Sequence, residues 1–574
     1  MSTETISDNT AIYLCDMSRC EPASALSTQQ NKSKWLLTDY ETEDGLKGVM
    51  MYADSRQSPP PVTLPLNVSG WHKLYIGINY TRTVLGDGAH LTPWTMWGSL
   101  RAKLSRDTGN HRIAMEQIWR HAIGHYQEKM SKPHTSIYEV YWRSADLTGQ
   151  ALELATPLHG PDNEDAITNV SWIKMVPMSD EEIDRDGEDQ PTLQTKRLAG
   201  AYCLGQMSGH TYGNVMYHPT DPGYIEEMIE PFRDSDFKML LWECIRGDIC
   251  VFNTRIGRVG WIGEQWNPEW IDPLEIAVKH AHDCGIDLYI SKRMIGPGFP
   301  FKHSPLQQNE YYYKNKQFAL KDEDGRDTSI LSLAYPNIRE HWVSLLREAV
   351  RYGADGVHLN LHRTNPFCLY EDPVVEPFMA VHGIDPRTLP FDDERWLRHR
   401  ASFVTQYVRE VRQMLNEEGQ SLDKRLGLAI TFWRDPYPLY YATDVETWIK
   451  EGLIDYAMPQ WIHLATDDGP KIVADLKKMT EGTNTQLWPD IFPRTPHAED
   501  YAQKLKQMYD AGADGFAFWS IELRTPRASE WAVLKRMGHY DTMDRYKKLA
   551  PTLWRNIPLR ELGGISTHHS HTDG

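Results

Sequence analysis

Four junctions in the second half of the chain repeat one pattern, in which an amphipathic helical segment ends at glycine and an apolar run follows directly. Glycine most readily ends a helix in the left-handed conformation, and an apolar run after it indicates a strand. Repeated turns of this kind favour a cyclic arrangement of βα units over an open doubly wound sheet, which is the alternative. The junctions are Gly285-Ile286-Asp287, Gly353-Ala354-Asp355-Gly356, Gly452-Leu453-Ile454-Asp455 and Gly512-Ala513-Asp514-Gly515.

Strand-like and helical segments alternate around these junctions, and the strand candidates number eight, which is the number that closes a barrel. We therefore predict an α/β fold, a (β/α)8 TIM barrel, over residues 196–545. Its predicted strands are Arg197 to Leu204, Phe237 to Cys244, Ile286 to Lys292, Gly356 to Leu361, Leu426 to Phe432, Ile454 to Gln460, Thr485 to Pro489 and Gly515 to Ser520. Its predicted helices include Asp272 to Cys284, Asn337 to Tyr352, Glu394 to Glu418, Asp444 to Glu451, Pro470 to Thr480 and Ala498 to Ala511.

Residues 41–180 alternate short strand-like runs with turn residues, and they show helical periodicity only at residues 112–130. This series predicts a β-sandwich domain before the barrel, similar in outline to carbohydrate-binding domains. Its predicted strands are Gly48 to Tyr52, Pro61 to Leu66, His72 to Asn79, Ser99 to Leu104, Ser136 to Arg143, Leu152 to Ala155 and Val170 to Val176.

The remaining segments carry weaker patterns. We expect residues 1–40 to form an N-terminal extension and residues 546–574 to form a C-terminal tail. The segment from Met178 to Gln194 is acidic and contains proline and glycine, so we expect a linker at residues 181–195. The final STHHSHTDG could hold a metal, but an exposed polar terminus is the simpler interpretation.

The composition restricts the partners of the protein. The chain has 61 basic and 79 acidic side chains, a net charge of -18, which repels nucleic acids and anionic membranes. No segment approaches the roughly 20 apolar residues that span a bilayer, and the N-terminus lacks the apolar stretch of a secretory signal. Seven cysteines without a CxxC pair predict reduced thiols in a cytoplasmic protein, unless a leader has been removed. They also predict no metal or other cofactor.

The 20 tryptophans and 28 tyrosines favour a carbohydrate partner, because sugar rings stack on aromatic side chains.

Barrel enzymes work at the carboxyl ends of their strands, so the residues that end each predicted strand are the site candidates. Glycoside hydrolysis usually needs two carboxyl groups, one as general acid and one as nucleophile or base. Asp490 ends an apolar strand, where a carboxyl group would be partly desolvated, and it is our first choice for one of the pair. Glu243 and Glu522 compete for the other role, followed by Asp248 and Asp435. The alternative for each is a helix cap or an ion pair with a neighbouring arginine.

Other strand ends carry groups suited to binding a sugar. Asn360 and His362 alternate with Leu361, so both are expected to point into the mouth of the barrel, where Gln460 also ends a strand. Trp433, Trp461 and Trp519 are candidate stacking platforms, or they pack under loops. Gln206 and His210 follow the first strand. Six cationic residues occur at these ends and suggest an anionic sugar, although they could equally tie loops to acidic residues: Arg246, Lys292, Arg293, Arg363, Arg434 and Arg524.

Two stretches resemble the bacterial barrels of glycosyl hydrolase-like family 10. They are Tyr352-Gly353-Ala354-Asp355-Gly356-Val357-His358-Leu359-Asn360 and Trp448-Ile449-Lys450-Glu451-Gly452-Leu453-Ile454-Asp455-Tyr456-Ala457-Met458-Pro459-Gln460-Trp461. The stretch Gly515-Phe516-Ala517-Phe518-Trp519-Ser520 resembles their closing strand, so the resemblance extends over residues 200–530. It implies a barrel that acts on glycosides. Where those proteins have an acidic residue at the end of the fourth strand, this chain has Asn360.

The leading hypothesis is therefore a glycoside hydrolase that acts on an oligo- or polysaccharide, with Asp490 and either Glu243 or Glu522 as its carboxyl pair. One alternative is a polysaccharide lyase, in which His362 or a tyrosine is the base and Arg363 or Arg434 neutralises a uronate. The other alternative is a glycan-binding protein without catalysis, suggested by Asn360.

Overall fold

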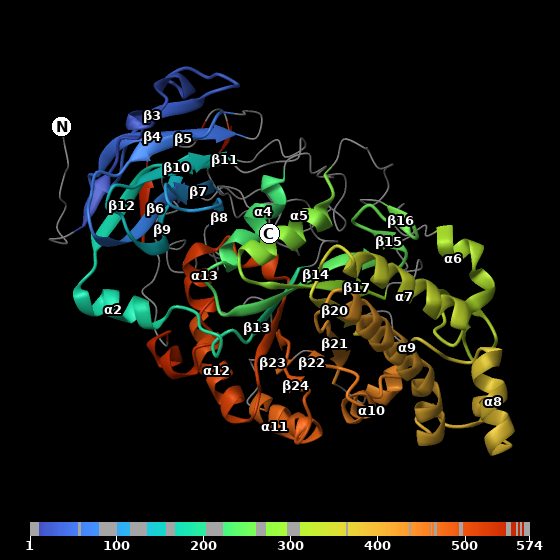
Figure 1. Cartoon of the computed structure of the whole chain (residues 1–574). Coiled ribbons are helices and arrows are strands. Elements are labelled where there is room, and N and C mark those ends of the chain that lie inside the picture. Colours follow the sequence, from blue (N-terminus) through green and yellow to red (C-terminus); the bar gives the residue numbers. More distant parts are fainter. Residues whose placement is uncertain are drawn as a thin grey trace.

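The computed structural model describes residues 11–54, 59–79, 100–114, 135–156, 167–202, 222–259, 271–294, 310–362, 366–434, 438–460, 462–463, 468–492, 498–546, 553–557, 561–562 and 565–566. These residues fall into two regions. Antiparallel sheets occupy residues 12–177, and parallel strands with helices occupy residues 198–546 (Figure 1).

The antiparallel region contains three sheets in the described residues, where a β-sandwich has two. All seven predicted strands are present. Alternate residues are buried in the strand that holds Leu74, Ile76 and Ile78, whereas the strand that begins at Trp172 buries four residues in succession. In spatial order, the first sheet is β1 (Ile12–Leu14), β12 (Trp172–Pro177), β6 (Trp71–Asn79), β9 (Thr135–Asp146) and β27 (Trp554–Ile557). The second is β5 (Val62–Pro65), β10 (Ala151–Ala155), β7 (Leu100–Leu104) and β8 (His111–Ile113), and the third is β11 (Ile167–Val170), β4 (Lys47–Asp54), β3 (Trp35–Glu41) and β2 (Leu26–Ser27).

Both ends of the chain differ from the prediction of an extension and a tail. Residues 12–40 contain β1, β2 and most of β3, and Trp35 is fully buried. After residue 546, β27 pairs antiparallel with β9, with Trp554 opposite Tyr138. These strands are short and pair with segments far away in the sequence, so local periodicity does not reveal them.

Two further local predictions are corrected. The expected linker contains helix α2 (Asp180–Glu188), which begins at a capping box between Ser179 and Glu182. None of its residues is buried, so it lacks the apolar stripe that identifies most helices. Within the expected helix at 112–130, residues 112 and 113 belong to β8, and residues 115–130 lie outside the described residues.

The second region is built on parallel strands that match all eight predicted segments. Their order is the order of the chain, and β13 pairs with both β14 and β26. The strands are β13 (Leu198–Tyr202), β14 (Phe237–Arg246), β17 (Asp287–Arg293), β20 (Gly356–Asn360), β21 (Gly427–Trp433), β22 (Tyr456–Gln460), β24 (Gln486–Leu487) and β26 (Phe516–Trp519).

The seventh segment continues past the two residues of β24, and its residues 488–490 are hydrogen-bonded to the strands on both sides. Toward β22, the Trp488 N–H donates to Ala457 O and the Asp490 N–H donates to Pro459 O. Toward β26, the Ala517 N–H donates to Pro489 O, and Asp490 forms a parallel bridge with Ala517. Each of the eight parallel segments therefore has a hydrogen-bonded neighbour on both sides.

Helices connect these strands and cover the outside of the sheet (Figure 1). All six predicted helices are present: α5 (Pro273–Asp283), α7 (Pro336–Val350), α9 (Glu394–Ser421), α10 (Val445–Lys450), α11 (Gly469–Thr480) and α12 (Ala498–Asp510). The structure adds α4 (Gly223–Ile229), α6 (Glu310–Lys314), α8 (Asp372–His382) and α13 (Ala528–Leu534). No helix in the described ranges combines the length and apolar character needed to cross a bilayer.

The four repeated turns have the predicted backbone. Their glycines are left-handed, with φ of 69° at Gly285, 100° at Gly353, 65° at Gly452 and 106° at Gly512. The aspartates of three turns also bind the start of the preceding strand: Asp355 accepts from the Leu288 N–H, Asp455 from the Leu428 N–H and Asp514 from the Leu487 N–H. The repeated sequence thus fixes each new strand against its neighbour.

Candidate active site at the carboxyl ends of the parallel strands

The interior of the parallel strands is a separate apolar cluster, and it defines which residues face inward. It contains Ala199, Ala201, Met239, Leu241, Tyr289, Ala429, Tyr456, Met458, Trp488, Ala517 and Trp519. Because side chains alternate along a strand, residues two or four positions further also face inward at the carboxyl ends. These residues are Glu243, Ser291, Arg293, Thr431, Trp433, Gln460 and Asp490. On β20, His358 and Asn360 share this face, because His358 bonds to Ser291 and Thr431.

Glu243 is a buried carboxylate flanked by two guanidinium groups. Arg246 Nε donates to Glu243 Oε1 at 2.9 Å, and Arg293 Nη1 lies 3.6 Å from the same oxygen. The register of β14 against β17 shifts between Glu243 and Ile245, which marks a β-bulge beside this carboxylate. The predicted candidate is thus at the inward face, and its arginine neighbours are part of the site.

Asp490 and Glu522 differ in their placement. Asp490 is 2% exposed and follows Trp488 on the inward face of the seventh segment. Glu522 lies in the short helix η9 (Ile521–Leu523), after Ser520 adopts a left-handed φ of 55° and interrupts the alternation of β26. Strand geometry therefore brings Glu243 and Asp490 to one face, and it does not place Glu522 there.

Two buried amides occupy the inward ends of β20 and β22. Asn360 and Gln460 are both fully buried, and no hydrogen bond from the described residues reaches the side-chain nitrogen or oxygen of either one. A buried polar group left without a hydrogen bond costs about 1–3 kcal/mol. Two such amides on one face indicate a site at which a ligand or water supplies the missing hydrogen bonds.

Aromatic rings surround His362. Its ring centroid lies 6.0 Å from that of Trp433 and 5.2 Å from that of Trp519, both with edge-to-face geometry. Since both tryptophans face inward, His362 extends over the same space, as predicted. Trp461 lies outside the described residues, as do Gln206, His210, Arg363 and Asp435.

His358 was not among the predicted site residues, yet it forms the layer beneath Asn360. Its Nδ1 lies 2.8 Å from Ser291 Oγ and its Nε2 lies 2.7 Å from Thr431 Oγ1. Burial lowers the pKa of His358 to about 3, against the opposing charge of Glu243, so the ring is neutral. The signal in the sequence was a second polar residue two positions before Asn360 in an otherwise apolar strand.

The predicted cationic cluster is divided: Arg246 and Arg293 lie beside Glu243, whereas Lys292 and Arg524 pack elsewhere. Lys292 is on the outward face of β17, where its ammonium lies 4.0 Å from the ring centre of Trp342 on α7 and donates to Gly247 O. Burial lowers the pKa of Lys292 to about 7. Arg524 lies over the ring of Tyr501, which belongs to the outer core. Arg434 follows β21 and is partly buried.

Two further members of that cluster, and the carboxylate after β14, form ion pairs. Arg246 and Arg293 pair with Glu243. Asp248, a lesser candidate, accepts at 2.6 Å from His341 on α7. In the described residues these cations balance acidic groups or pack on rings, so they give no support for an anionic substrate at this face.

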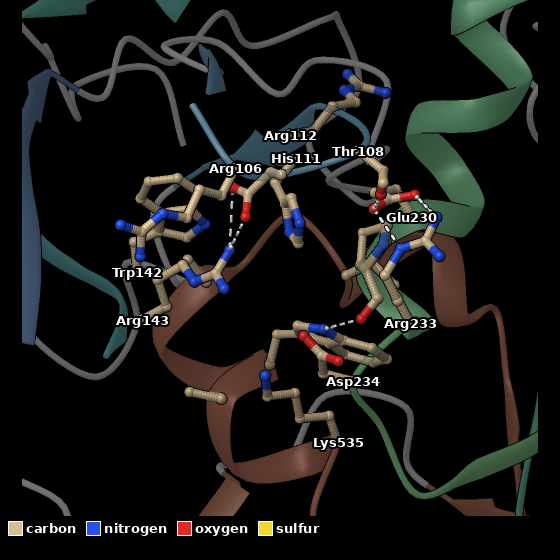
Figure 2. Close-up of a pocket in the computed structure, with 16 residues that line it drawn as sticks. Arg106, Thr108, His111, Arg112, Trp142, Arg143, Glu230, Arg233, Asp234 and Lys535 are labelled. Atoms are coloured by element: carbon tan, nitrogen blue, oxygen red, sulfur yellow. Dashed lines mark hydrogen bonds and ion pairs between the residues drawn. The ribbon is translucent and has the colours of Figure 1, made fainter. Parts of the chain in front are cut away.

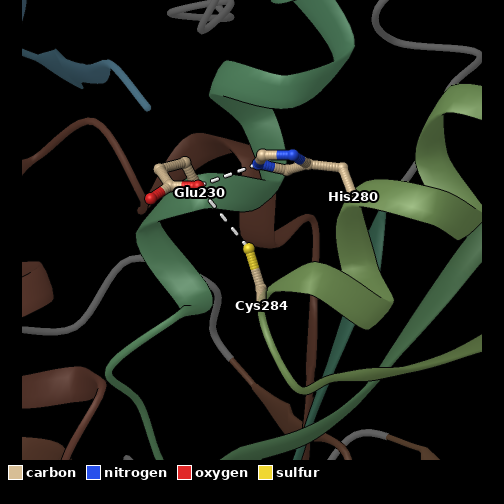
Figure 3. A group of neighbouring side chains, drawn as sticks. All are labelled: Glu230, His280 and Cys284. Atoms are coloured by element: carbon tan, nitrogen blue, oxygen red, sulfur yellow. Dashed lines mark hydrogen bonds and ion pairs between the residues drawn. The ribbon is translucent and has the colours of Figure 1, made fainter. Parts of the chain in front are cut away.

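A group of possible metal ligands lies elsewhere, outside the strands (Figure 3). His280 Nε2 is 2.8 Å and Cys284 Sγ is 3.6 Å from Glu230 Oε2. Burial opposes ionisation of Glu230, but hydrogen bonds from Arg233, His280 and Thr108 outweigh it and hold its pKa well below the usual range. Burial, together with the charge of Glu230, raises the pKa of Cys284. A protonated thiol and a carboxylate already bound to arginine describe a polar network rather than a metal centre.

Comparison with known proteins does not assign a family. No family model matches the sequence, and no curated protein sequence matches it. The catalytic domain of a β-amylase from Paenibacillus polymyxa is similar over 61% of this chain and 99% of that chain, with 11% identity and a TM-score of 0.43. An α-galactosidase from Thermus thermophilus is similar over 88% and 95%, with 10% identity and a TM-score of 0.34. A cycloalternan-degrading enzyme from Trueperella pyogenes is similar over 92% and 70%, with 12% identity and a TM-score of 0.36. Because these TM-scores are below 0.5, they carry no conclusion about activity, and the resemblance to glycosyl hydrolase-like family 10 is not confirmed.

Proposed function

We propose that residues 198–546 form a closed (β/α)8 barrel and that its carboxyl-end face hydrolyses a glycosidic bond. One observation supports this proposal most: Glu243 and Asp490, on the second and seventh strands, share the inward face with two buried amides and two tryptophans. Hydrolysis of a glycoside needs two carboxyl groups, donors and acceptors for sugar hydroxyls, and flat apolar surfaces. This face combines all three.

The surroundings of the two carboxyl groups suggest different roles. Arg246 and Arg293 place positive charge beside Glu243, which favours its ionised form, so we assign Glu243 as the nucleophile or base. Asp490 lies beyond the buried Trp488 in an apolar strand, so we assign it as the acid that protonates the leaving oxygen. Asn360 and Gln460 hold sugar hydroxyls, and Trp433 and Trp519 form the wall on which a sugar ring stacks.

This assignment also accounts for Asn360. The resembling barrels have an acidic residue at the end of the fourth strand, and here that position is an amide. In our proposal the two carboxyl groups come from the second and seventh strands, and the fourth strand binds substrate. The outward position of Lys292 and the ion pairs of Arg246 and Arg293 favour an uncharged glycan.

The test is to incubate the protein with a panel of neutral oligo- and polysaccharides and to measure the release of new reducing ends. We expect Glu243→Gln and Asp490→Asn each to lower kcat by at least about 100-fold, because each loses a proton-transfer or nucleophilic group. Asp475→Asn, on the exposed face of α11, is the matched control and should keep full activity. Unchanged turnover in Asp490→Asn rejects the assignment, and an unsaturated product would show a lyase instead.

A further inference from the structure

A cavity of about 230 Å³ lies between the antiparallel region and the parallel region. Figure 2 shows that its walls come from residues 106–112 around β8, from β9, from the turn before β14 and from α13. Backbone and side-chain bonds join the two regions beside it, including the Ala114 N–H to Pro526 O and Ser529 Oγ to Tyr141 O. The cavity is therefore enclosed by both regions.

This cavity is separate from the proposed active site. Asp234, in its wall, precedes β14 by three residues, whereas Glu243 lies near the carboxyl end of the same strand. At about 3.3 Å per residue, the six steps along the strand from Phe237 to Glu243 alone span roughly 20 Å. Whatever binds in the cavity cannot touch Glu243.

The wall of the cavity carries more positive than negative charge. Arg106, Arg112, Arg143, Arg233 and Lys535 line it together with three acidic residues. Arg106 and Arg112 also pair with carboxylates beside the cavity, Asp146 and Glu227. Arg143 pairs with Asp107 at 3.0 Å and Arg233 pairs with Glu230 at 2.7 Å. His111 adds no charge, because burial and the nearby Arg143 lower its pKa to about 3.

Lys535 differs from the arginines. Among the described residues, no carboxylate lies within ion-pair distance of its ammonium, which Figure 2 shows extending from the end of α13 toward the cavity. Burial, then the charges of Arg536 and Arg143, lower the pKa of Lys535 to about 7, and Asp234 and Asp186 only partly oppose them. A bound anion would stabilise the charged form of a desolvated ammonium that lies beside other cations.

We propose that this cavity binds a small molecule bearing an oxyanion, a carboxylate, sulfate or phosphate group, with Lys535 as its main charge partner. Arg143 also lines the cavity and adds a second cation near the bound ligand. A water molecule occupies about 30 Å³, so the cavity has room for a group several times larger than one water. The Trp142 ring on the same wall suits an apolar or sugar face of the ligand.

The test is calorimetric titration of the full chain with inorganic phosphate, sulfate and glucuronate at constant ionic strength, with glucose as the uncharged control. We expect at least one of the three anions to bind and glucose not to bind, and the tightest anion identifies the group recognised. Lys535→Met should weaken that binding by tenfold or more. Lys478→Met removes an exposed lysine from α11 and is the matched control, which should bind like the wild type.

The pH dependence of anion binding provides a second readout that does not depend on glycan hydrolysis. A bound anion stabilises the ammonium of Lys535, so binding near pH 8 should take up a proton and should weaken as the pH rises above 7. Far-UV circular dichroism establishes that Lys535→Met is folded. The proposal is overturned if no anion binds, or if Lys535→Met binds the anion as tightly as the wild type with the same proton uptake.

Discussion

The Nε atom of Arg246 lies 2.9 Å from Oε1 of Glu243, and both residues belong to β14. Residues three positions apart on one strand normally have their side chains on opposite faces, because side chains alternate along a strand. The shift of register between Glu243 and Ile245 changes this alternation and brings the guanidinium to the carboxylate. The bulge therefore builds an ion pair into the proposed active site.

We predict that Arg246→Met lowers activity most at acidic pH. Glu243 would then lose this guanidinium and keep the more distant Arg293 at 3.6 Å, so its ionised form is less favoured. The acidic limb of kcat/KM should move upward by about one pH unit or more. Initial rates between pH 4 and 8 measure the shift, and Arg398→Met, at an exposed ion pair of α9, should leave the profile unchanged.

The amides Asn360 and Gln460 should bind substrate at the expense of stability. Replacing Asn360 by Leu, or Gln460 by Met, removes a buried polar group that has no partner among the described residues, so the free energy of unfolding should stay constant or rise by about 1 kcal/mol. KM should increase roughly two- to tenfold for each lost hydrogen bond to the sugar.

Urea unfolding and steady-state kinetics on the same variants test whether stability is kept while KM increases. Ser291→Ala is the contrasting variant, because it removes a partner of His358 and should cost about 1–3 kcal/mol. A loss of stability in Asn360→Leu as large as that in Ser291→Ala would contradict the prediction.

Buried His358 should make the fold acid-sensitive. Its folded pKa of about 3 lies below the ordinary histidine pKa of 6.5, so only the unfolded chain takes up this proton between those two values. The stability that neutral His358 provides is complete above pH 6.5 and declines as the pH falls toward 3. Between pH 7 and pH 5, wild type should lose about 2 kcal/mol more than His358→Gln. Urea titrations at both pH values measure this difference, and equal losses would show that His358 is protonated in the folded protein.

Strand β27 should stabilise the antiparallel region through Arg555. This arginine lies over the ring of Tyr13 and pairs with the buried Glu139 and with Asp44 at 2.9 Å. Arg555→Met leaves Glu139 with Lys174 at 3.1 Å as its one cationic partner among the described residues, besides the Tyr13 hydroxyl at 3.0 Å, so the free energy of unfolding should fall by about 2 kcal/mol or more. Arg398→Met breaks an exposed pair and should cost under about 1 kcal/mol. Chemical denaturation compares the two variants.

Sequence patterns predicted the parallel region well for a local reason. A glycine such as Gly353 ends a helix whatever its surroundings, and an apolar run after it forms a strand in most contexts. The alternation of Asn360 and His362 with Leu361 likewise indicated the inward face before any contact was known. In contrast, β1 and β27 consist of few residues and are strands only because β12 and β9 supply their hydrogen bonds.

Side-chain partners could not be predicted in the same way. Lys292 and Arg293 are adjacent in the sequence, yet alternation directs the first toward Trp342 and the second toward Glu243. The cationic cluster predicted from positions at the strand ends was therefore wrong for Lys292. Similarly, Lys535 gave no signal, because the walls of its cavity come from segments separated by hundreds of residues.

The sequence by itself determined the order of the eight parallel strands, the left-handed turns between them and the strand ends at which Glu243, Asn360 and Asp490 lie. These features depend on backbone preferences and side-chain periodicity, which act over a few residues. Only the tertiary structure decided which charges are paired, which buried amides remain without a partner in the described residues, and where the cavity beside Lys535 forms. Burial and ion pairing depend on distances between segments remote in the chain, and those distances exist only after folding.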